Sequence, residues 1–144
     1  MYAFESSIFI NRSPQDVFDY VSEPANNTQW QSGVESSEWT SDGPRGVGAT
    51  YMVERSFLGR RTDSEIEMSV WDPPNQTRGR TINGPVQLEV TTDYEAQEDG
   101  TQLTVSAEAE FDGFFKMAEG LVGKQVEKQV ASDLAALKLL LESD

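Results

Sequence analysis

The sequence contains no cysteine and no histidine. The lack of cysteine excludes disulfides, thiolate nucleophiles and thiolate metal sites, and the lack of histidine removes the commonest general base and transition-metal ligand. No window approaches the ~20 apolar residues of a membrane span, and residues 1–5 lack the basic start and apolar run of a signal peptide. We therefore expect a cytoplasmic protein without a membrane span, and no cofactor or metal is indicated.

Acidic residues outnumber basic residues along the whole chain. Asp and Glu total 25 against 11 Lys and Arg, which gives a formal net charge of −14. This charge repels phosphate, so we expect no nucleic-acid partner. The acidic, lysine-poor composition favours a halophilic protein, and an ordinary acidic protein is the alternative, because net charge reports on solubility rather than on fold or function.

The chain opens with a strand that leads into a short helix. Apolar and polar residues alternate up to Ile10. Ser13, Pro14 and Asp16 then supply an N-cap, a proline at the first helical position and an acid in the first turn. A second short helix or turn is expected at residues 26–30, and a brief strand at 33–39.

Alternating segments then predict a meander of antiparallel strands with one apolar face. These segments are residues 48–57, 65–70, 77–82, 86–94 and 103–111. In the second of them, alternation places Ile66, Met68 and Val70 on the inner face and Trp71 on the polar face.

A long amphipathic helix is predicted from Gly113 to about Leu141, where apolar residues recur at helical spacing. At about 1.5 Å per residue it would extend roughly 40 Å, enough to cross the concave face of a sheet. We predict one α+β domain over residues 1–144 with a helix-grip fold. In this fold a curved antiparallel sheet of six to seven strands wraps around the long C-terminal helix, with two short helices after the first strand.

Several short motifs stand in a recognisable order. They are residues 10–21 (INRSPQDVFDYV), Trp30, residues 46–49 (GVGA), 71–74 (WDPP) and 99–103 (DGTQL). With the order of elements, they resemble nearly the full length of the START-like, or helix-grip, superfamily, in particular its polyketide cyclase/dehydrase-like branch. The resemblance implies a cavity between sheet and C-terminal helix that holds an apolar or partly aromatic small molecule. It implies no particular chemistry, because lipid carriers, hormone receptors, cyclases and chaperone-binding domains share this scaffold.

Candidate ligand contacts are the side chains assigned to the concave face. They are Tyr51, Val53, Arg55, Phe57, Met68, Leu88, Val90, Tyr94, Phe115, Val122 and Val126. An inward Arg55 needs a carboxylate or a ligand anion; the alternatives are a bulge that turns it to solvent or an internal acid, for which Asp63 is a candidate. Tyr51 and Tyr94 either donate hydrogen bonds to a ligand carbonyl or anchor the core.

Other prominent side chains have structural interpretations. Arg78 and Arg80 are expected on the outer face, paired across strands with glutamates such as Glu67 and Glu89. Trp30 and Trp39 are expected near the mouth of the cavity, in a dimer patch or in the core.

The sequence leaves three classes of function open. The first is binding or transport of a hydrophobic small molecule, lipid-like or polyketide/aromatic, with no catalytic residues. The second is a polyketide cyclase/dehydratase-type enzyme in which Arg55 and the tyrosines polarise the carbonyls of a folded ketide. The third is a protein-interaction module that acts through its acidic sheet surface without a ligand. Either a monomer or a homodimer is compatible with each.

Overall fold

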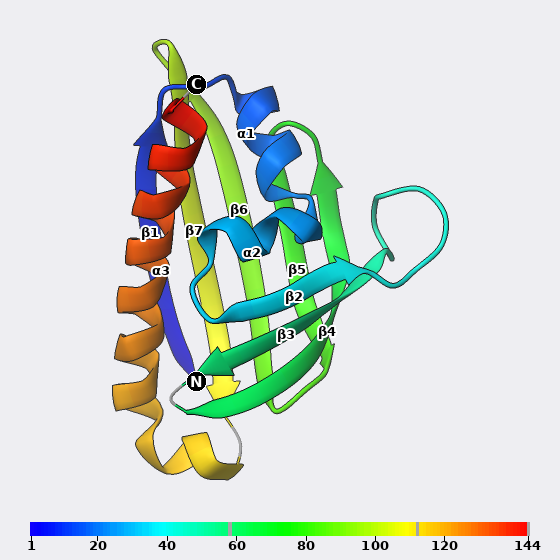
Figure 1. The fold of residues 1–144 in the computed structure, drawn as a ribbon, viewed down its shortest axis with the longest axis vertical. Helices are drawn as coiled ribbons and strands as arrows, with labels where there is room; N and C mark the ends of the chain where they lie inside the picture. Colours follow the sequence, from blue (N-terminus) through cyan, green and yellow to red (C-terminus); the bar gives the residue numbers. More distant parts are fainter. Residues whose placement is uncertain (58, 112, 144) are drawn as a thin grey trace.

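The computed structural model describes the backbone of residues 1–57, 59–111 and 113–143, and their side chains except at 57 and 113–115 (Figure 1). In this part of the chain, seven strands form one antiparallel sheet in the order β1-β7-β6-β5-β4-β3-β2. The strands are β1 (Tyr2–Ile10), β2 (Val34–Trp39), β3 (Thr50–Phe57), β4 (Arg60–Asp72), β5 (Gln76–Asn83), β6 (Val86–Gln97) and β7 (Gly100–Phe111).

The helices are grouped after β1 and at the end of the chain. They are α1 (Pro14–Val21), the 3₁₀ helix η1 (Pro24–Asn26), α2 (Asn27–Trp30), the 3₁₀ helix η2 (Gly113–Ala118) and α3 (Glu119–Glu142). The N-cap prediction for α1 is confirmed, because the Ser13 hydroxyl accepts a hydrogen bond of 3.2 Å from the Asp16 amide. This arrangement is the predicted helix-grip fold.

The long helix begins later than predicted. Residues from Gly113 to Ala118 form the separate 3₁₀ segment η2, and α3 starts at Glu119 (Figure 1). Over one or two turns, apolar spacing fits a 3₁₀ and an α-helix about equally well, so the sequence pattern did not separate the two segments.

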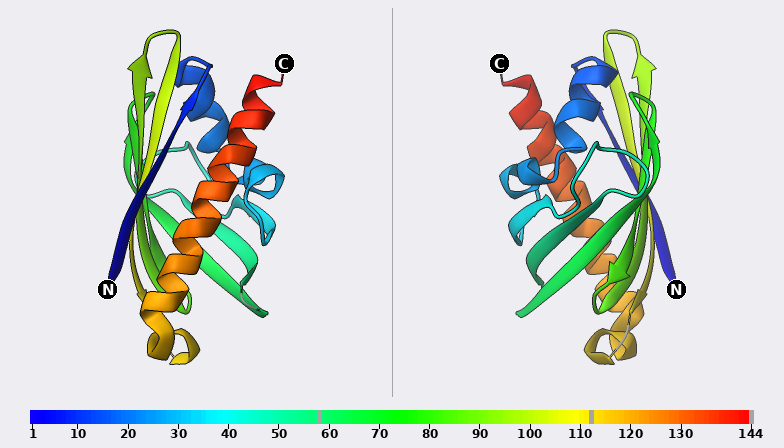
Figure 2. Two further views of the ribbon diagram at one scale, coloured as in Figure 1. Left: turned by 90° about the vertical axis from the view of Figure 1, so that its left-hand side faces the viewer. Right: turned by 90° about the vertical axis from the view of Figure 1, so that its right-hand side faces the viewer.

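Helices α1, α2 and α3 lie on the same face of the sheet, which we call the inner face (Figure 2). Two apolar clusters pack there. The first contains Ile10, Val17, Phe18, Tyr94, Leu103, Leu134, Leu137 and Leu141. The second contains Ala109, Phe111 and Val122, with Tyr2, Val86, Leu88 and Val126 packed against it. Burial of a leucine such as Leu137, which is 0% exposed, contributes about 2 kcal/mol. The clusters therefore fasten both ends of α3 to the sheet.

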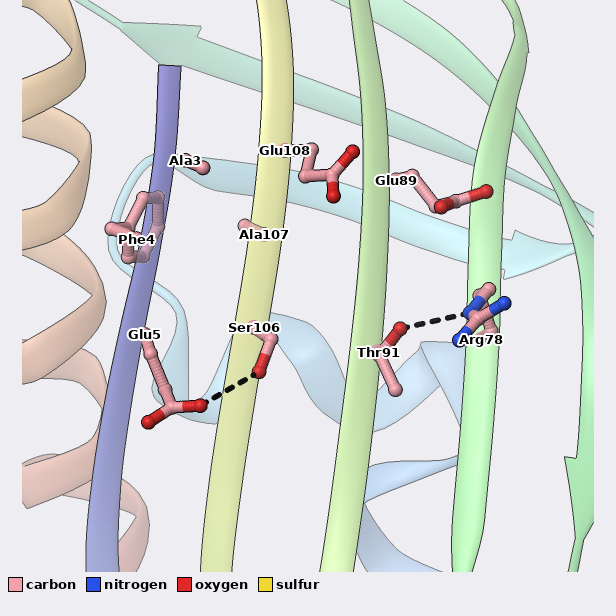
Figure 3. Close-up of a pocket in the computed structure, with 9 residues that line it drawn as sticks. All are labelled: Ala3, Phe4, Glu5, Arg78, Glu89, Thr91, Ser106, Ala107 and Glu108. Atoms are coloured by element: carbon pink, nitrogen blue, oxygen red, sulfur yellow. Dashed lines mark hydrogen bonds between the residues drawn. The ribbon is translucent and has the colours of Figure 1, made fainter.

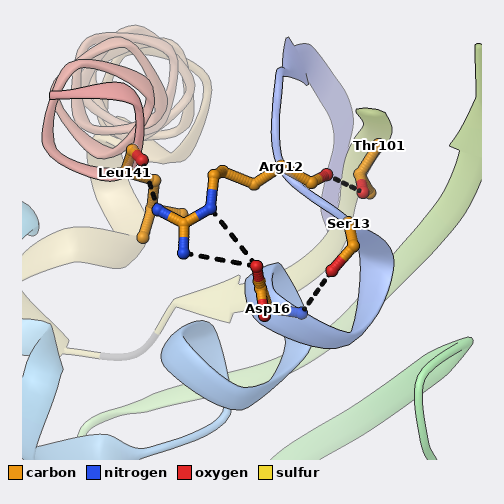
Figure 4. Close-up of polar contacts among 5 residues, drawn as sticks. All are labelled: Arg12, Ser13, Asp16, Thr101 and Leu141. Carbon is orange, nitrogen blue, oxygen red and sulfur yellow. Dashed lines mark hydrogen bonds and ion pairs between the residues drawn. The ribbon is translucent and has the colours of Figure 1, made fainter. Parts of the chain in front are cut away.

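Arg12 joins three segments at the end of the molecule where α3 finishes (Figure 4). Its Nη1 donates a hydrogen bond of 2.8 Å to the Leu141 carbonyl, and its Nε and Nη2 bind Asp16 of α1. The hydroxyl of Thr101, at the start of β7, donates to the Arg12 carbonyl at 2.8 Å. These contacts hold the last turn of α3 against α1 and the sheet.

A β-bulge in β4 corrects the predicted face of Trp71. Met68 lies opposite Gly79, but the register then shifts so that Val70 lies opposite Arg78. One extra residue reverses the alternation, so Val70 faces outward and Trp71 faces inward. The Trp71 ring accordingly packs 5.5 Å from the ring of Phe18 in α1.

Within the described residues, no helix has the length and apolar character needed to cross a membrane.

Candidate functional site

The inner face carries the predicted contact residues that the structure describes. On β3, Tyr51, Val53 and Arg55 alternate with outward side chains. Strand β4 contributes Met68, strand β6 contributes Leu88, Val90 and Tyr94, and helix α3 contributes Val122 and Val126. The side chains of Phe57 and Phe115 lie outside the described part, so their predicted roles stay predictions.

The inward side chains beneath α3 differ in burial. Val53 and Met68 are buried, at 5% and 7% exposure, yet neither belongs to the two apolar clusters that the described residues form. Leu88, Val90 and Val126 point inward and keep part of their surface accessible. Tightly packed core side chains lose nearly all of their accessible surface, so these three inward side chains leave apolar surface accessible beneath α3.

Arg55 projects from β3 into this interior. Its Nη2 donates a long hydrogen bond of 3.5 Å to the Gln31 side chain, just after α2. Burial lowers the pKa of Arg55, and the nearby Tyr51 and Asp133 oppose that shift. The guanidinium therefore points inward, as the alternation of the strand predicts, and its surroundings contain few polar partners.

Asp133 of α3 is a site residue that the sequence reasoning missed. It is 8% exposed, and its Oδ1 accepts hydrogen bonds from the Ser32 amide and hydroxyl at 3.1 and 2.9 Å. Burial raises the pKa of Asp133, against the lowering effects of Ser32 and Arg55. A signal existed in the sequence, because Asp133 stands three residues after Val130 and four before Leu137, on the apolar stripe of the helix.

Three buried polar atoms of the described residues have no hydrogen-bond partner: Asn27 Oδ1, Trp30 Nε1 and the Tyr94 hydroxyl. Burial raises the pKa of Tyr94, although the neighbouring Thr77 hydroxyl opposes this shift. Burial also raises the pKa of Tyr51. Both phenols therefore stay protonated at neutral pH and are hydrogen-bond donors.

An aromatic row borders these polar groups. Ring centroids lie 5.7 Å apart for Tyr51 and Trp39, 6.1 Å for Trp39 and Trp71, and 5.5 Å for Trp71 and Phe18. The row ends at Tyr94, 5.0 Å from Phe18. Edge and tilted contacts of this kind are favourable ring geometries, so the row gives one wall of the interior a fixed aromatic surface.

Trp39 is fixed at the outer end of this row by two charged residues. Its Nε1 donates to Glu23 Oε1 at 3.2 Å. The Arg45 guanidinium lies 5.0 Å from the Trp39 ring and forms a 3.5 Å ion pair with Glu23. Trp39 is half-buried there, so it is positioned at the border between interior and solvent.

The outer face of the sheet carries a shallow hollow of about 640 Å³ that extends over β1, β7, β6 and β5 (Figure 3). Its lining includes Glu5, Glu89, Glu108, Arg78, Thr91 and Ser106. Arg78 Nε donates to the Thr91 hydroxyl at 2.9 Å, not to a carboxylate as predicted. The lining is polar and acidic, so this hollow does not suit an apolar ligand.

Contacts on the outer face also test the predicted partners of Arg80 and Arg55. Arg80 forms a 2.8 Å ion pair with Glu67, which confirms the predicted cross-strand pairing. Asp63 pairs with Arg61 at 3.6 Å. It therefore faces away from Arg55, and its proposed role as the partner of Arg55 is wrong. Adjacent residues in a strand point to opposite faces, and Asp63 lies opposite Glu54 rather than opposite Arg55.

A curved sheet, a long helix and a partly polar interior between them define a helix-grip protein. The family model for polyketide cyclase / dehydrase and lipid transport proteins matches residues 1–142. The chain belongs to this family. Among proteins with curated functions, none matches the sequence.

Solved structures share the fold over the whole chain. A protein from Thermus thermophilus is 19% identical, with a TM-score of 0.85 and coverage of 99% of this chain and 98% of that one. A START superfamily protein from Mycobacterium smegmatis is 16% identical, with a TM-score of 0.81 and 99% coverage of both chains. The di-domain ARO/CYC BexL from the BE-7585A biosynthetic pathway is 16% identical, with a TM-score of 0.77, and the match covers 98% of this chain and 50% of that one. At these identities the likeness establishes the fold alone.

Proposed function

We propose that this protein binds a hydrophobic small molecule, lipid-like or polyketide/aromatic, between the inner face of the sheet and α3. The observation that carries the proposal is the set of inward apolar side chains, Leu88, Val90 and Val126, that stay only half-buried beneath the helix. An apolar ligand would remove this surface from water, at about 25 cal/mol per Å². The family description, which includes lipid transport, supports the same class of ligand.

The titratable groups favour binding over proton-transfer chemistry. The pKa values of Tyr51 and Tyr94 are raised by burial, which moves both phenols further from the neutral range in which a general acid or base is effective. In the described part of the chain, no group of acidic side chains is placed to hold a metal ion. The groups present can orient a ligand through hydrogen bonds.

A cyclase/dehydratase activity is the second candidate. Arg55 and Tyr51 lie on the same face of β3 and influence each other electrostatically. Two such donors would polarise the carbonyl of a ketide held in a folded conformation. The fold shared with a di-domain ARO/CYC protein is compatible with this activity. Turnover of a ketide substrate, as opposed to saturable binding alone, separates the two candidates.

The binding proposal is tested with two fluorescent probes, cis-parinaric acid and pyrene. The parent protein is expected to bind at least one of them saturably, because shape and apolar surface dominate such sites. Leu88→Trp adds a large ring on the inner face beneath α3 and should abolish probe binding. Glu89→Trp, one residue away on the outer face, is the matched control and should bind as the parent does.

Circular dichroism and thermal melting establish that both variants are folded. Failure of the parent to bind either probe would contradict the proposal and favour an interaction module. Equal loss of binding in the two variants would also contradict the assigned location of the site.

A further inference from the structure

Arg55 is a half-buried cation whose hydrogen-bonding capacity is almost unused. A guanidinium has five N–H donors, and among the residues that the structure describes Arg55 makes one hydrogen bond, of 3.5 Å, to Gln31. Within the described residues, no carboxylate lies within 4.0 Å of it to form an ion pair. Burial of a charge is costly unless the charge is paired and hydrogen-bonded.

Three acids that could pair with Arg55 have other partners. Glu54, the neighbour of Arg55 in sequence, points to the other face of β3 and binds Arg61 and Ser36. Asp63 binds Arg61 on the outer face. Asp133 influences Arg55 electrostatically, but its Oδ1 is held by the Ser32 amide and hydroxyl. Gln129 of α3 in turn donates to the Ser32 carbonyl at 2.7 Å and to its hydroxyl at 2.9 Å. This network holds the Asp133 carboxylate at Ser32, two residues before β2, and Asp133 forms no ion pair with Arg55 in the described part of the chain.

The other unpartnered groups of the interior are mostly donors. Trp30 Nε1 can only donate and has no partner. The Tyr94 hydroxyl, in a side chain 3% exposed, has the Thr77 hydroxyl as a neighbour that lowers its pKa, as a donor does, and no acceptor for its own O–H. A buried donor without an acceptor lowers the stability of the folded protein. Arg55 and these donors therefore match a ligand that brings acceptor oxygens into the interior, with its apolar part against the half-buried side chains.

We propose that the ligand is an apolar molecule with a carboxylate group, and that Arg55 binds this carboxylate. The inference rests on the proposed binding function and specifies its ligand class. A guanidinium matches a carboxylate through two parallel hydrogen bonds. One positive charge neutralises one carboxylate, whereas a phosphate dianion would leave excess negative charge close to Asp133.

The test compares cis-parinaric acid with its methyl ester, which has the same chain and no negative charge. Hydrogen bonds to charged groups contribute enough to change affinity by about 10- to 100-fold. The parent protein is therefore expected to bind the acid about 10- to 100-fold more tightly than the ester. Arg55→Gln should remove this preference, so that the acid and the ester bind with about equal affinity.

Arg80→Gln is the matched control, because Arg80 is an exposed arginine paired with Glu67 on the outer face. It should keep the preference for the acid. If Arg55→Gln does not fold, Arg55→Lys, which keeps the charge without the paired donors, should show a reduced preference. Equal affinity of the parent for acid and ester would overturn this inference and leave the binding function intact. If the parent binds pyrene but neither the acid nor the ester, this inference is overturned and the binding function stands. If it binds none of the three compounds, both are overturned.

Discussion

Gly123 of α3 lies directly against the ring of Tyr2 in β1, so closely that a Cβ at this position would overlap the ring carbons. The Tyr2 hydroxyl donates to Glu127 Oε1 at 2.8 Å, one turn further along the helix. The missing side chain at position 123 therefore allows the helix to approach the edge strand, and the hydroxyl bond fixes the position of the helix along that strand. The same contact sets one boundary of the interior beneath α3.

The close contact predicts that Gly123→Ala destabilises the protein. Alanine favours a helix by about 1 kcal/mol over glycine, but overpacking against Tyr2 costs about 1–3 kcal/mol, so we expect a net loss in the free energy of unfolding. Gly120→Ala is the control, because nothing lies within 4 Å of its added Cβ, and it should be neutral or slightly stabilising. Urea unfolding measures both, and a Gly123→Ala variant as stable as the control would contradict the contact.

The bulge in β4 predicts unequal costs for two adjacent substitutions. Trp71 packs inward against Phe18 and Trp39, so Trp71→Ala should cost about 3–5 kcal/mol. Val70 lies opposite the outward Arg78, so Val70→Ala should cost less than about 1 kcal/mol. Equilibrium unfolding in guanidinium chloride distinguishes these values. If alternation continued unbroken through β4, the larger loss would fall on Val70.

The contrast between β4 and β6 explains how far the sequence predicts this fold. Alternation assigned the faces of Leu88 and Glu89 correctly, because β6 pairs with β7 without a register shift. It failed at Trp71, because a bulge depends on how two strands pair and leaves no clear pattern within one strand.

The site shows the same division between local pattern and spatial contact. Alternation of side chains along the strand correctly predicts an inward Arg55, because this alternation depends only on the two-residue period of a strand. Its surroundings were not predictable, because Gln31 and Asp133 come from parts of the chain distant in sequence. Asp133 was not predicted because the apolar residues around it on the helix dominate the pattern of that stripe. Its partner Ser32 also lies 101 residues away in the sequence.

The pKa values of Asp133 and Glu142 are shifted in opposite directions, so the two carboxylates should change stability with pH in opposite ways. The pKa of Asp133 is raised above 3.8 by burial, so the folded state binds more protons than the unfolded state in the window above 3.8. The free energy of unfolding of the parent, relative to Asp133→Asn, should therefore rise as pH falls through this window. The pKa of Glu142 is lowered from 4.5, mainly by its hydrogen bond with Lys138. Its stabilisation is present above 4.5 and is lost as pH falls through its folded-state pKa.

Urea unfolding of the parent, Asp133→Asn and Glu142→Gln from about pH 3 to pH 7 tests this pair of signs. The stability difference between parent and variant should grow towards acid for Asp133→Asn and shrink towards acid for Glu142→Gln. If the two differences changed in the same direction as pH falls, the assigned pKa directions would be contradicted.

Glu89 and Glu108 lie directly opposite each other on β6 and β7, and both are exposed. Like charges opposite each other destabilise a sheet, whereas opposite charges contribute about 0.2–1 kcal/mol. Glu108→Lys should therefore raise the free energy of unfolding at low salt, and the gain should shrink at about 1 M salt, where the Debye length is about 3 Å. The parent, with its net charge of −14, should itself become more stable over the same range.

Glu38→Lys is the control, because it makes the same change in net charge opposite the uncharged Met52. Thermal melting in low and high salt should therefore show a smaller low-salt gain for Glu38→Lys than for Glu108→Lys. Equal gains for the two variants would mean that total charge, and not the Glu89–Glu108 pair, sets the effect.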